Sequence, residues 1–362
     1  MSSEPSERLW TVAAAFALPG RIVAIKPYGS GLINDTFLVD TDAPAKAILQ
    51  RINAKVFSEP ERIQANLRIL LDHVRDQNNV SKSGLRLPGL VAARDGRDFH
   101  WTAERDFWRM LTFIRDTRST EVPADLSEAR EMGVALGRFH ALVSDLAPDR
   151  LHDTLPGFHV TPAYLRRFDS ILSSTPQGQE SSALGSCLDF IERRRSIASI
   201  LEDAKCAGLL QTRVIHGDPK FSNVLFDTHS GRAVSLIDLD TVKPGLIHYD
   251  LGDCLRSCCN RAGEAGDAHS VRFDLDFCRS VLHGYFSEAA SILTDQDVAF
   301  LFGAIRLIPF ELGLRFLTDY LEGNVYFKFI EPEENLHRAM VQFRLVESIE
   351  RQEGPIRALL CR

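Results

Sequence analysis

Short apolar runs separated by turn-forming residues dominate the first third of the chain. Three of them are bounded by Gly, Asn, Asp and Pro, and this pattern is typical of β-strands. They cover residues 22–25, 37–39 and 47–49. A helical spacing over 7–17 precedes them, and an amphipathic helix is predicted from 60 to about 75, with Pro60 in its first turn.

A second group of apolar runs follows this helix. Residues 87–93 and 99–103 flank the dipeptide Asp95-Gly96, which favours a hairpin turn, and a mixed run covers 107–114. Together with the three earlier runs, they predict a small β-rich lobe that spans residues 1–115.

Beyond residue 116 the apolar period becomes mostly helical. The predicted helices lie near 127–145, 163–173, 184–205, 248–260, 271–290, 296–320 and 334–351. The exception is 213–240, which has the pattern strand, loop, strand, turn, strand. We therefore expect an α+β protein of two lobes, in which the larger, helical lobe spans 116–362 and carries a polar β-loop.

Composition narrows the class of partner. The chain has 362 residues, 44% hydrophobic content and a net charge of −7, so it has no basic surface signature for nucleic acid or anionic membrane. We expect small-molecule partners, and the oligomeric state stays open. Seven cysteines without regular spacing, and an N-terminal apolar run too short for a signal or spanning helix, predict a cytoplasmic protein. The group Cys254, Cys258 and Cys259 is predicted to pack within a helix.

The polar loop of 213–240 carries the candidate chemistry. His216, Asp218 and Asn223 have the spacing H-x-D-x-x-x-x-N of the kinase catalytic loop. Phosphoryl transfer needs a carboxylate to accept the proton of the attacking hydroxyl and an amide oxygen to reach Mg²⁺. Asp218 and Asn223 fit these parts, and Lys220 is placed to offset phosphate charge. His216 is expected to hold the loop backbone rather than to titrate.

Two further acidic segments follow the loop. Asp238 ends the apolar strand of "LIDLDT", where a kinase keeps its main Mg²⁺-binding carboxylate. In "YDLGD", Asp250 is expected to accept hydrogen bonds from the backbone of the catalytic loop, and Asp253 is expected to cap the following helix.

The segments "HGDPKFSNVLFD", "LIDLDTVKPG" and "YDLGDCLRS" resemble the aminoglycoside phosphotransferase/choline kinase superfamily. The resemblance is closest to its N-acetylhexosamine 1-kinase branch. The stretches that resemble this branch are "GLINDTFLV", "ILQRINAKVFSEP", "WRMLTFI", "LGRFHALVSDL" and "RFLTDYLEGNVYFK". They run from near residue 20 to near residue 330, and they imply a protein-kinase-like fold with two lobes.

The resemblance implies a set of roles for the nucleotide site. Asp218 would be the base, and Asn223 and Asp238 would hold Mg²⁺. ATP would lie between the lobes, with its adenine against Thr112 and Ile114 in the connector.

The same resemblance assigns a sugar side to the cleft. Asp240 and Arg315 would face the sugar. Further candidates for this pocket are Asn34, Asp35 and Tyr326. An alternative for Arg315 is a salt bridge along its helix to Glu311, four residues earlier.

Two features depart from the pattern of protein kinases. The stretch Gly29-Ser30-Gly31 is a short version of a glycine-rich phosphate loop, and a hairpin turn explains it equally well. Gln50 stands where a protein kinase has its phosphate-binding lysine, as it does in the resembling branch, and Arg51 is adjacent. Strand alternation places Gln50 and Arg51 on opposite faces, so only one of them can reach the nucleotide. Lys220 could supply part of the missing charge.

The leading hypothesis is therefore an ATP-dependent kinase that phosphorylates the anomeric hydroxyl of an N-acetylhexosamine or a related hexose. A kinase of a cationic alcohol, such as an aminoglycoside or choline, is the nearest alternative, because Glu311, Asp319, Glu322 and several aromatic residues lie in the C-terminal third. A non-catalytic nucleotide-binding protein is a third possibility. A protein kinase is disfavoured, because no activation-loop-like segment follows Asp238.

Overall fold

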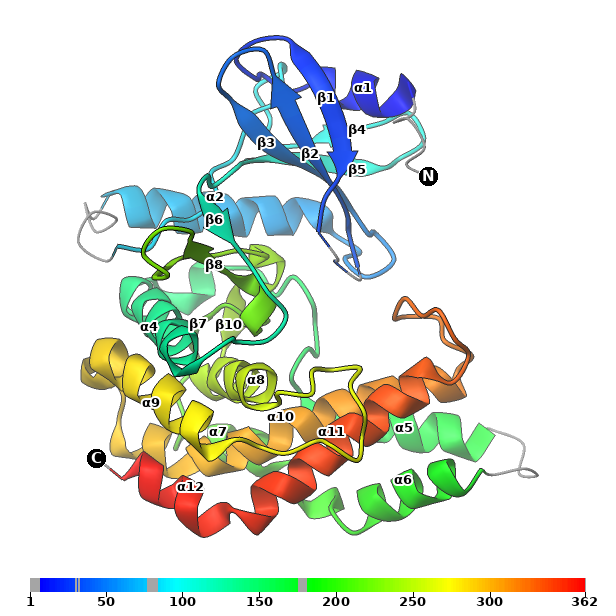
Figure 1. Cartoon of the computed structure of the whole chain (residues 1–362). Coiled ribbons are helices and arrows are strands. Elements are labelled where there is room, and N and C mark those ends of the chain that lie inside the picture. Colours follow the sequence, from blue (N-terminus) through cyan, green and yellow to red (C-terminus); the bar gives the residue numbers. More distant parts are fainter. Residues whose placement is uncertain (1–6, 30, 32, 77–83, 175–180, 362) are drawn as a thin grey trace.

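The computed structural model describes residues 7–29, 31, 33–76, 84–174 and 181–361. They form two lobes, a small one built on an antiparallel sheet and a larger helical one (Figure 1). This arrangement confirms the predicted two-lobed α+β fold. Within the described ranges, no helix combines the length and the apolar character that crossing a membrane requires.

The sheet of the small lobe has five strands in the order β1-β2-β3-β5-β4. The strands are β1 (Ile22–Pro27), β2 (Asp35–Thr41), β3 (Lys46–Ile52), β4 (His100–Trp101) and β5 (Phe107–Thr112). One face of the sheet, with Val39, Leu49 and Met110, is buried against α1 (Glu7–Ala14) and the residues that follow it. The opposite face carries Gln50 and Arg109, which are direct partners in the β3–β5 register. That face points toward the cleft between the lobes.

Helix α2 (Pro60–Asp76) belongs to the first third of the chain but packs with the large lobe. Its residues Ile63, Leu67 and Leu70 are buried in the same apolar cluster as Phe139 of α4. The amphipathic pattern predicted this helix, but it did not indicate which lobe the apolar face would contact. The predicted lobe boundary at residues 115 and 116 lies on the connection from β5 to β6, and it stays a prediction.

The predicted strand over 87–93 is wrong. This segment makes only isolated bridges, Leu90 with Leu111 and Ala93 with Phe16, because Pro88 and Gly89 interrupt it. The predicted turn is present, since the amide of Gly96 donates to the carbonyl oxygen of Ala93 at 2.9 Å and Gly96 has φ +85°.

The large lobe contains nine described α-helices, of which the last was not predicted. They are α4 (Leu126–Leu142), α5 (Thr161–Ser174), α6 (Ser182–Glu192), α7 (Ile200–Cys206), α8 (Ile247–Cys259), α9 (Leu275–Ala289), α10 (Asp295–Leu321), α11 (Glu334–Arg351) and α12 (Glu353–Leu360). The single helix expected over 184–205 is divided into α6 and α7 by a 3₁₀ turn, η2 (Arg195–Ile197). The three cysteines of α8 are fully buried in the apolar core, as predicted.

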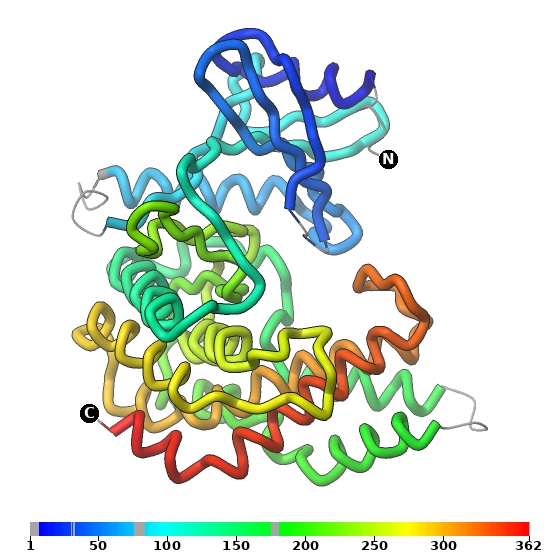
Figure 2. Tube along the Cα trace, viewed as in Figure 1, coloured from blue at the N-terminus to red at the C-terminus, as the bar shows by residue number. Residues whose placement is uncertain are grey.

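The segment 213–240 contains the short strands that its pattern predicted. A three-stranded sheet is formed by β6 (Thr117–Arg118), β8 (Val224–Asp227) and β9 (Ala233–Leu236), and a two-stranded one by β7 (Arg213–Ile215) and β10 (Lys243–Gly245). The trace in Figure 2 follows the chain from β5 of the small lobe through β6 to α4 of the large lobe. The polar loop therefore lies where the two lobes meet.

Helices α4 and α9 cross at very short range, and glycine makes this possible. A Cβ atom on Gly133 would lie 2.0 Å from the carbonyl oxygen of Val281, and one on Gly284 would lie 2.1 Å from that of Arg130. Backbone atoms cannot move aside as a flexible side chain can, so the crossing depends on the absence of these Cβ atoms.

We predict that Gly133→Ala lowers the free energy of unfolding by about 3 kcal/mol, because the added methyl group separates α4 from α9. Gly185→Ala in α6 is the matched control, since its Cβ would meet no atom within 4 Å. Because the added methyl group has open space there, the change should stabilise the protein by about 0.5–1 kcal/mol. Urea unfolding of both variants measures the difference, and equal midpoints would contradict the proposed dependence.

Candidate active site

A buried carboxylate holds the catalytic loop between β7 and β8. Asp250, fully buried in α8, accepts hydrogen bonds from the backbone amides of His216 at 2.7 Å and Gly217 at 2.8 Å. Its Oδ2 also lies 2.9 Å from Nε2 of His140. The sequence prediction for Asp250 is thereby confirmed, and the loop has a fixed backbone.

His216 acts as a structural residue of the loop. Its Nε2 donates to the carbonyl oxygen of Ile237 at 3.0 Å, and its Nδ1 accepts from the amide of Asp218 at 3.3 Å. These partners require the neutral ring, and burial lowers the pKa of His216. The adjacent Gly217 has φ +89°, and a Cβ there would lie 2.5 Å from the carbonyl oxygen of Thr241. The prediction that His216 holds backbone is confirmed.

A second histidine, which the sequence did not reveal, supports the loop from the other side. The two ring nitrogens of His159 face only acceptors, Oε1 of Glu311 at 3.0 Å and the carbonyl oxygen of Gly217 at 2.7 Å. Such partners require a doubly protonated ring. Burial alone would lower the pKa of His159, but Glu311 outweighs it and the pKa is raised. Glu311 therefore does not form the alternative salt bridge along the helix to Arg315.

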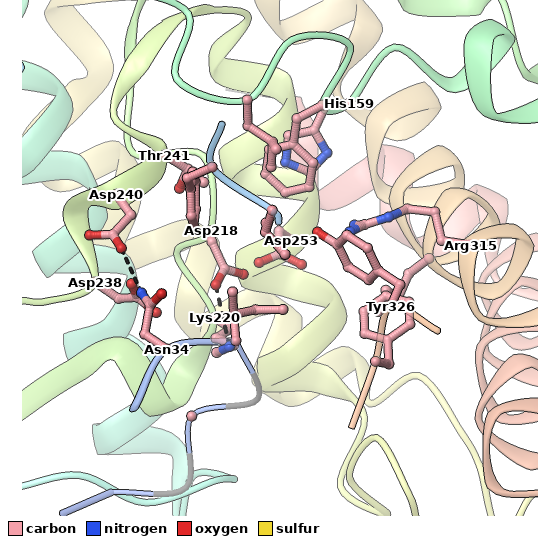
Figure 3. A pocket seen from close by; sticks show the side chains of 18 of the residues that line it. Asn34, His159, Asp218, Lys220, Asp238, Asp240, Thr241, Asp253, Arg315 and Tyr326 are labelled. Atoms are coloured by element: carbon pink, nitrogen blue, oxygen red, sulfur yellow. Dashed lines mark hydrogen bonds and ion pairs between the residues drawn. The ribbon is translucent and has the colours of Figure 1, made fainter. Parts of the chain in front are cut away.

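Asp218 lies at the centre of the cleft (Figure 3). Its carboxylate is 3.3 Å from Nζ of Lys220. The side-chain amide of Asn223 donates to the backbone carbonyl oxygen of Asp218 at 2.8 Å. Burial alone would raise the pKa of Asp218, but the positive charge of Lys220 outweighs it and the pKa lies below its usual value. The structure thus brings Asp218, Lys220 and Asn223 together, with an ionised carboxylate available to accept a proton.

Asp238 follows β9 in a left-handed backbone conformation, with φ +63°. Burial, with the nearby Asp240, raises the pKa of Asp238 to about 7, so this carboxylate lacks sufficient compensating charge. In the described part of the chain, no three His, Cys, Asp or Glu side chains form a metal-binding group. The pair of Asp238 and Asn223 nevertheless fits Mg²⁺, which binds through one or two protein oxygens, with phosphates and water completing the shell. The amide nitrogen of Asn223 is committed to Asp218, which turns the oxygen into the available ligand atom.

Gln50 and Gly31, predicted to lie near the nucleotide, line the cleft, whereas Arg51 does not. Arg51 pairs with Asp35 and with Asp106 on the outer face of the sheet. The open choice between Gln50 and Arg51 is therefore decided in favour of Gln50 as the cleft-facing residue. Gly29 is exposed, with φ +78°, and Ser30 lies outside the described residues.

The connector candidates lie at the end of β5. The hydroxyl of Thr112 accepts from the amide of Gly89 at 2.8 Å, and the carbonyl oxygen of Ile114 accepts from the hydroxyl of Thr117 at 2.8 Å. Neither Thr112 nor Ile114 lines the cleft. Their contact with adenine stays a prediction.

Arg315 and Tyr326 line the opposite end of the same cleft (Figure 3). The guanidinium of Arg315 lies over four aromatic rings, with 5.0–5.8 Å between its central carbon and the ring centroids. The rings belong to Phe158, Tyr164, Tyr326 and Phe327. We call this group the arginine–aromatic cluster.

The remaining substrate candidates have different surroundings. Asp240 lines the cleft, but its carboxylate is held by Arg109 and by Nδ2 of Asn34, the latter at 2.8 Å. Asn34 also lines the cleft, whereas Asp35 does not and pairs with Arg51 on the surface. The roles of these residues in substrate binding stay predictions.

The predicted cap at Asp253 is wrong, because α8 begins at Ile247 and Asp253 lies inside it. Its Oδ1 accepts from Nε of Arg256 at 2.7 Å, and both residues line the cleft. The sequence also missed Arg109, a fully buried cation. A charged residue in the middle of the apolar run "WRMLTFI" was the signal that could have identified it.

The pair of His159 and Glu311 should give stability a characteristic pH dependence. Folding raises the pKa of His159 above 6.5 and lowers that of Glu311 below 4.5, so the ion pair contributes fully between these values. The contribution is lost as pH rises through the raised pKa of His159. We expect Glu311→Gln to cost about 2 kcal/mol at pH 5.5 and clearly less at pH 9. Unfolding at both pH values measures this, and a pH-independent loss would contradict a charged pair.

Comparison with known proteins agrees with this geometry. Residues 24–285 match the model of a family described as "Phosphotransferase enzyme family". A microcompartment-associated aminopropanol kinase superposes with a TM-score of 0.68 at 17% identity, covering 97% of this chain and 98% of the other. An aminoglycoside phosphotransferase from Alicyclobacillus acidocaldarius gives 0.63 at 16% identity and covers 98% of both chains. An amicoumacin kinase solved with AMP-PNP and Ca²⁺ gives 0.57 at 15% identity, covering 97% and 95%.

At these identities the solved structures establish the fold, while the family match spans more than half of the chain. The predicted superfamily is confirmed, and the narrower N-acetylhexosamine branch stays a prediction. A chain with this two-lobed fold, this catalytic loop and this match belongs to the phosphotransferase enzyme family of small-molecule kinases.

Proposed function

We propose that this protein transfers the γ-phosphoryl group of ATP to a hydroxyl of a neutral sugar, with the anomeric hydroxyl of an N-acetylhexosamine as the preferred acceptor. The observation that carries the choice of a neutral acceptor is the arginine–aromatic cluster. Its rings could bind a cationic substrate, but the guanidinium of Arg315 already lies over them.

The charge of Arg315 is permanent. Burial would lower its pKa, but the neighbouring Tyr164, Tyr326 and Glu311 outweigh this, and the pKa is raised. A trimethylammonium or aminoglycoside ammonium group at this end of the cleft would meet a fixed positive charge at close range. A neutral sugar instead offers hydroxyl and carbonyl oxygens that can accept from the guanidinium, and its ring faces can pack on Tyr326.

Three acidic residues of the C-terminal third that could attract a cationic acceptor, Glu311, Asp319 and Glu322, are engaged within the protein. Glu311 holds His159 and Thr161, and Glu322 pairs with Arg167. Asp319 accepts from the amides of Val325, Tyr326 and Phe327 and from Nδ2 of Asn335, at 2.7–3.0 Å. Because of these contacts, the three carboxylates have few free lone pairs that could accept hydrogen bonds from an ammonium group. They also fix the turn that presents Tyr326.

The chemistry follows from the residues of the loop. Asp218 lies within the cleft as an ionised acceptor for the proton of the attacking hydroxyl, and Lys220 offsets charge on the transferred group. Mg²⁺, when bound by Asn223 and Asp238, would neutralise phosphate charge. The amicoumacin kinase, whose structure holds AMP-PNP and Ca²⁺, supports ATP and a divalent ion as partners of this fold.

A kinase of a cationic alcohol is the second candidate. The aminopropanol kinase and the aminoglycoside phosphotransferase are named for amine-containing substrates, which favours it. Asp253 also favours it, because its Oδ2 is buried beside the cleft without a hydrogen-bond partner among the described residues. A non-catalytic protein is disfavoured, since Asp218, Asn223 and Asp238 converge as catalysis requires.

The seven free cysteines support the predicted cytoplasmic setting.

The first prediction that follows from the proposed function concerns Asp218. Asp218→Asn should lower turnover about 100-fold or more, because the amide cannot accept the proton, while affinity for MgADP should stay within threefold of wild type. Asp276→Asn, which alters an exposed carboxylate of α9, is the control and should leave both unchanged. Release of ADP with the best acceptor measures turnover. Full activity of Asp218→Asn would exclude Asp218 as the base.

The second prediction tests the acceptor class. With MgATP, ADP release should be confined to neutral sugars in a panel of N-acetylglucosamine, N-acetylgalactosamine, glucose, choline and an aminoglycoside. Arg315→Met should lower kcat/KM for the best sugar at least tenfold, as expected for loss of a charged hydrogen bond. Arg167→Met, which removes an exposed cation of α5, should not. Turnover of choline or the aminoglycoside alone would overturn the neutral-acceptor proposal and favour the second candidate.

A further inference from the structure

Arg109 is the buried cation on the cleft-facing side of the small lobe's sheet. It lies on β5 directly opposite Gln50 of β3, and its side chain is 1% exposed. Its Nε and Nη2 donate to Oε1 of Gln50 at 3.0 and 2.7 Å. Gln50 in turn donates to the hydroxyl of Thr36 at 3.1 Å. The amide of residue 50 is therefore oriented by Arg109.

Arg109 also reaches across to the large lobe, where Nη2 forms an ion pair with Asp240. Both partners are almost completely buried, so the loss of either one would leave the other as an uncompensated buried charge. The other oxygen of Asp240 accepts from Asn34 of the small lobe, at 2.8 Å. The small lobe thus holds both oxygens of one carboxylate that belongs to the large lobe. We call Arg109, Asn34 and Asp240 the interlobe tie.

Asp240 lies two residues after Asp238, the proposed Mg²⁺ ligand. Its carbonyl oxygen accepts from the hydroxyl of Thr154 at 2.7 Å, so both its backbone and its side chain are held. Asp238 itself is in the left-handed region, which a non-glycine residue keeps only when its surroundings fix it. The interlobe tie supplies part of that constraint.

We propose that Arg109 is a positioning residue for the nucleotide site. It couples the sheet of the small lobe to the proposed Mg²⁺-binding segment. It thereby takes the part that a lysine at position 50 would play in a protein kinase. In protein kinases, a lysine of the third strand forms an ion pair that must be in place for catalysis. Here the third strand has Gln50, and the cation comes from its register partner on β5. The inference rests on the part of the proposed function in which the cleft binds ATP with Mg²⁺, and not on the identity of the acceptor.

One further atom agrees with this assignment. Nη1 of Arg109 is buried and has no hydrogen-bond partner among the described residues, although nearly all such donors in proteins are paired. The guanidinium that pairs with Asp240 therefore keeps one N–H donor that no described residue of the protein uses.

The test measures the affinity of a fluorescent ADP analogue with excess Mg²⁺ and, separately, with EDTA, in the absence of any acceptor. Arg109→Met should weaken binding at least tenfold with Mg²⁺ and less than threefold with EDTA, because the metal-binding segment loses its tie. The double variant Gln50→Lys/Arg109→Met moves the cation to the register partner and should restore Mg²⁺-dependent affinity to within threefold of wild type. Arg51→Met, on the opposite face of the same sheet, is the control and should change neither affinity.

Equal weakening with Mg²⁺ and with EDTA, or none, would overturn the proposal, as would failure of the double variant to recover. Arg109→Met is expected to fold, because α2 keeps a separate link to the large lobe through Asn66, whose Nδ2 donates to the carbonyl oxygen of Val242 at 2.8 Å. If it does not fold, Asp240→Asn breaks the same pair from the other end and must show the same Mg²⁺-selective loss. No acceptor is present, so a silent acceptor panel would refute the sugar assignment without affecting this result.

Discussion

The active site depends on the hydrogen bonds that Asp250 accepts from the amides of His216 and Gly217. A fully buried carboxylate without partners would cost several kcal/mol, so the helix that carries it and the loop that satisfies it stabilise each other. His140 contributes a third contact and is itself 2.9 Å from the hydroxyl of Tyr285. Burial would raise the pKa of Asp250, but these partners keep it low, so the anion persists. The position of Asp218, two residues after His216, follows from this anchor.

Each buried cation near the cleft restrains a different part of the site. His159 links the catalytic loop to α10 through Gly217 and Glu311, and Arg109 links the small lobe to Asp240. Arg315 instead has aromatic rings as its main neighbours and faces the cleft. Arg256, a fourth buried cation that lines the cleft, pairs with Asp253. Three of these four cations are thus held in ion pairs within the protein, and Arg315 retains donors for a ligand. This division explains why Arg315, and not the other three, is the best candidate for acceptor recognition.

The local parts of the site could be predicted from the sequence, and the long-range parts could not. The spacing of His216, Asp218 and Asn223 predicted that they would lie together, because all three are on one short loop. The pair of Arg109 and Asp240 is separated by 131 positions, and no local pattern indicates such a partner. The error at Asp253 has another cause. A cap depends on where a helix begins, and the sequence pattern defines the end of a helix only to within a few residues.

The backbone of Asp238 shows how local strain and long-range contacts combine. A left-handed aspartate costs roughly 1 kcal/mol relative to ordinary backbone, and the chain on both sides must keep it there. Before it, the amide of Ile237 donates to the carbonyl oxygen of Asn223 at 2.9 Å, and the carbonyl oxygen of Ile237 accepts from His216. After it, Asp240 is held by Thr154 and by the small lobe. The first set of contacts lies within the large lobe, and the second requires both lobes. The conformation of this carboxylate is therefore sensitive to how the lobes sit together, so the contacts between the lobes and the geometry proposed for Mg²⁺ binding depend on each other.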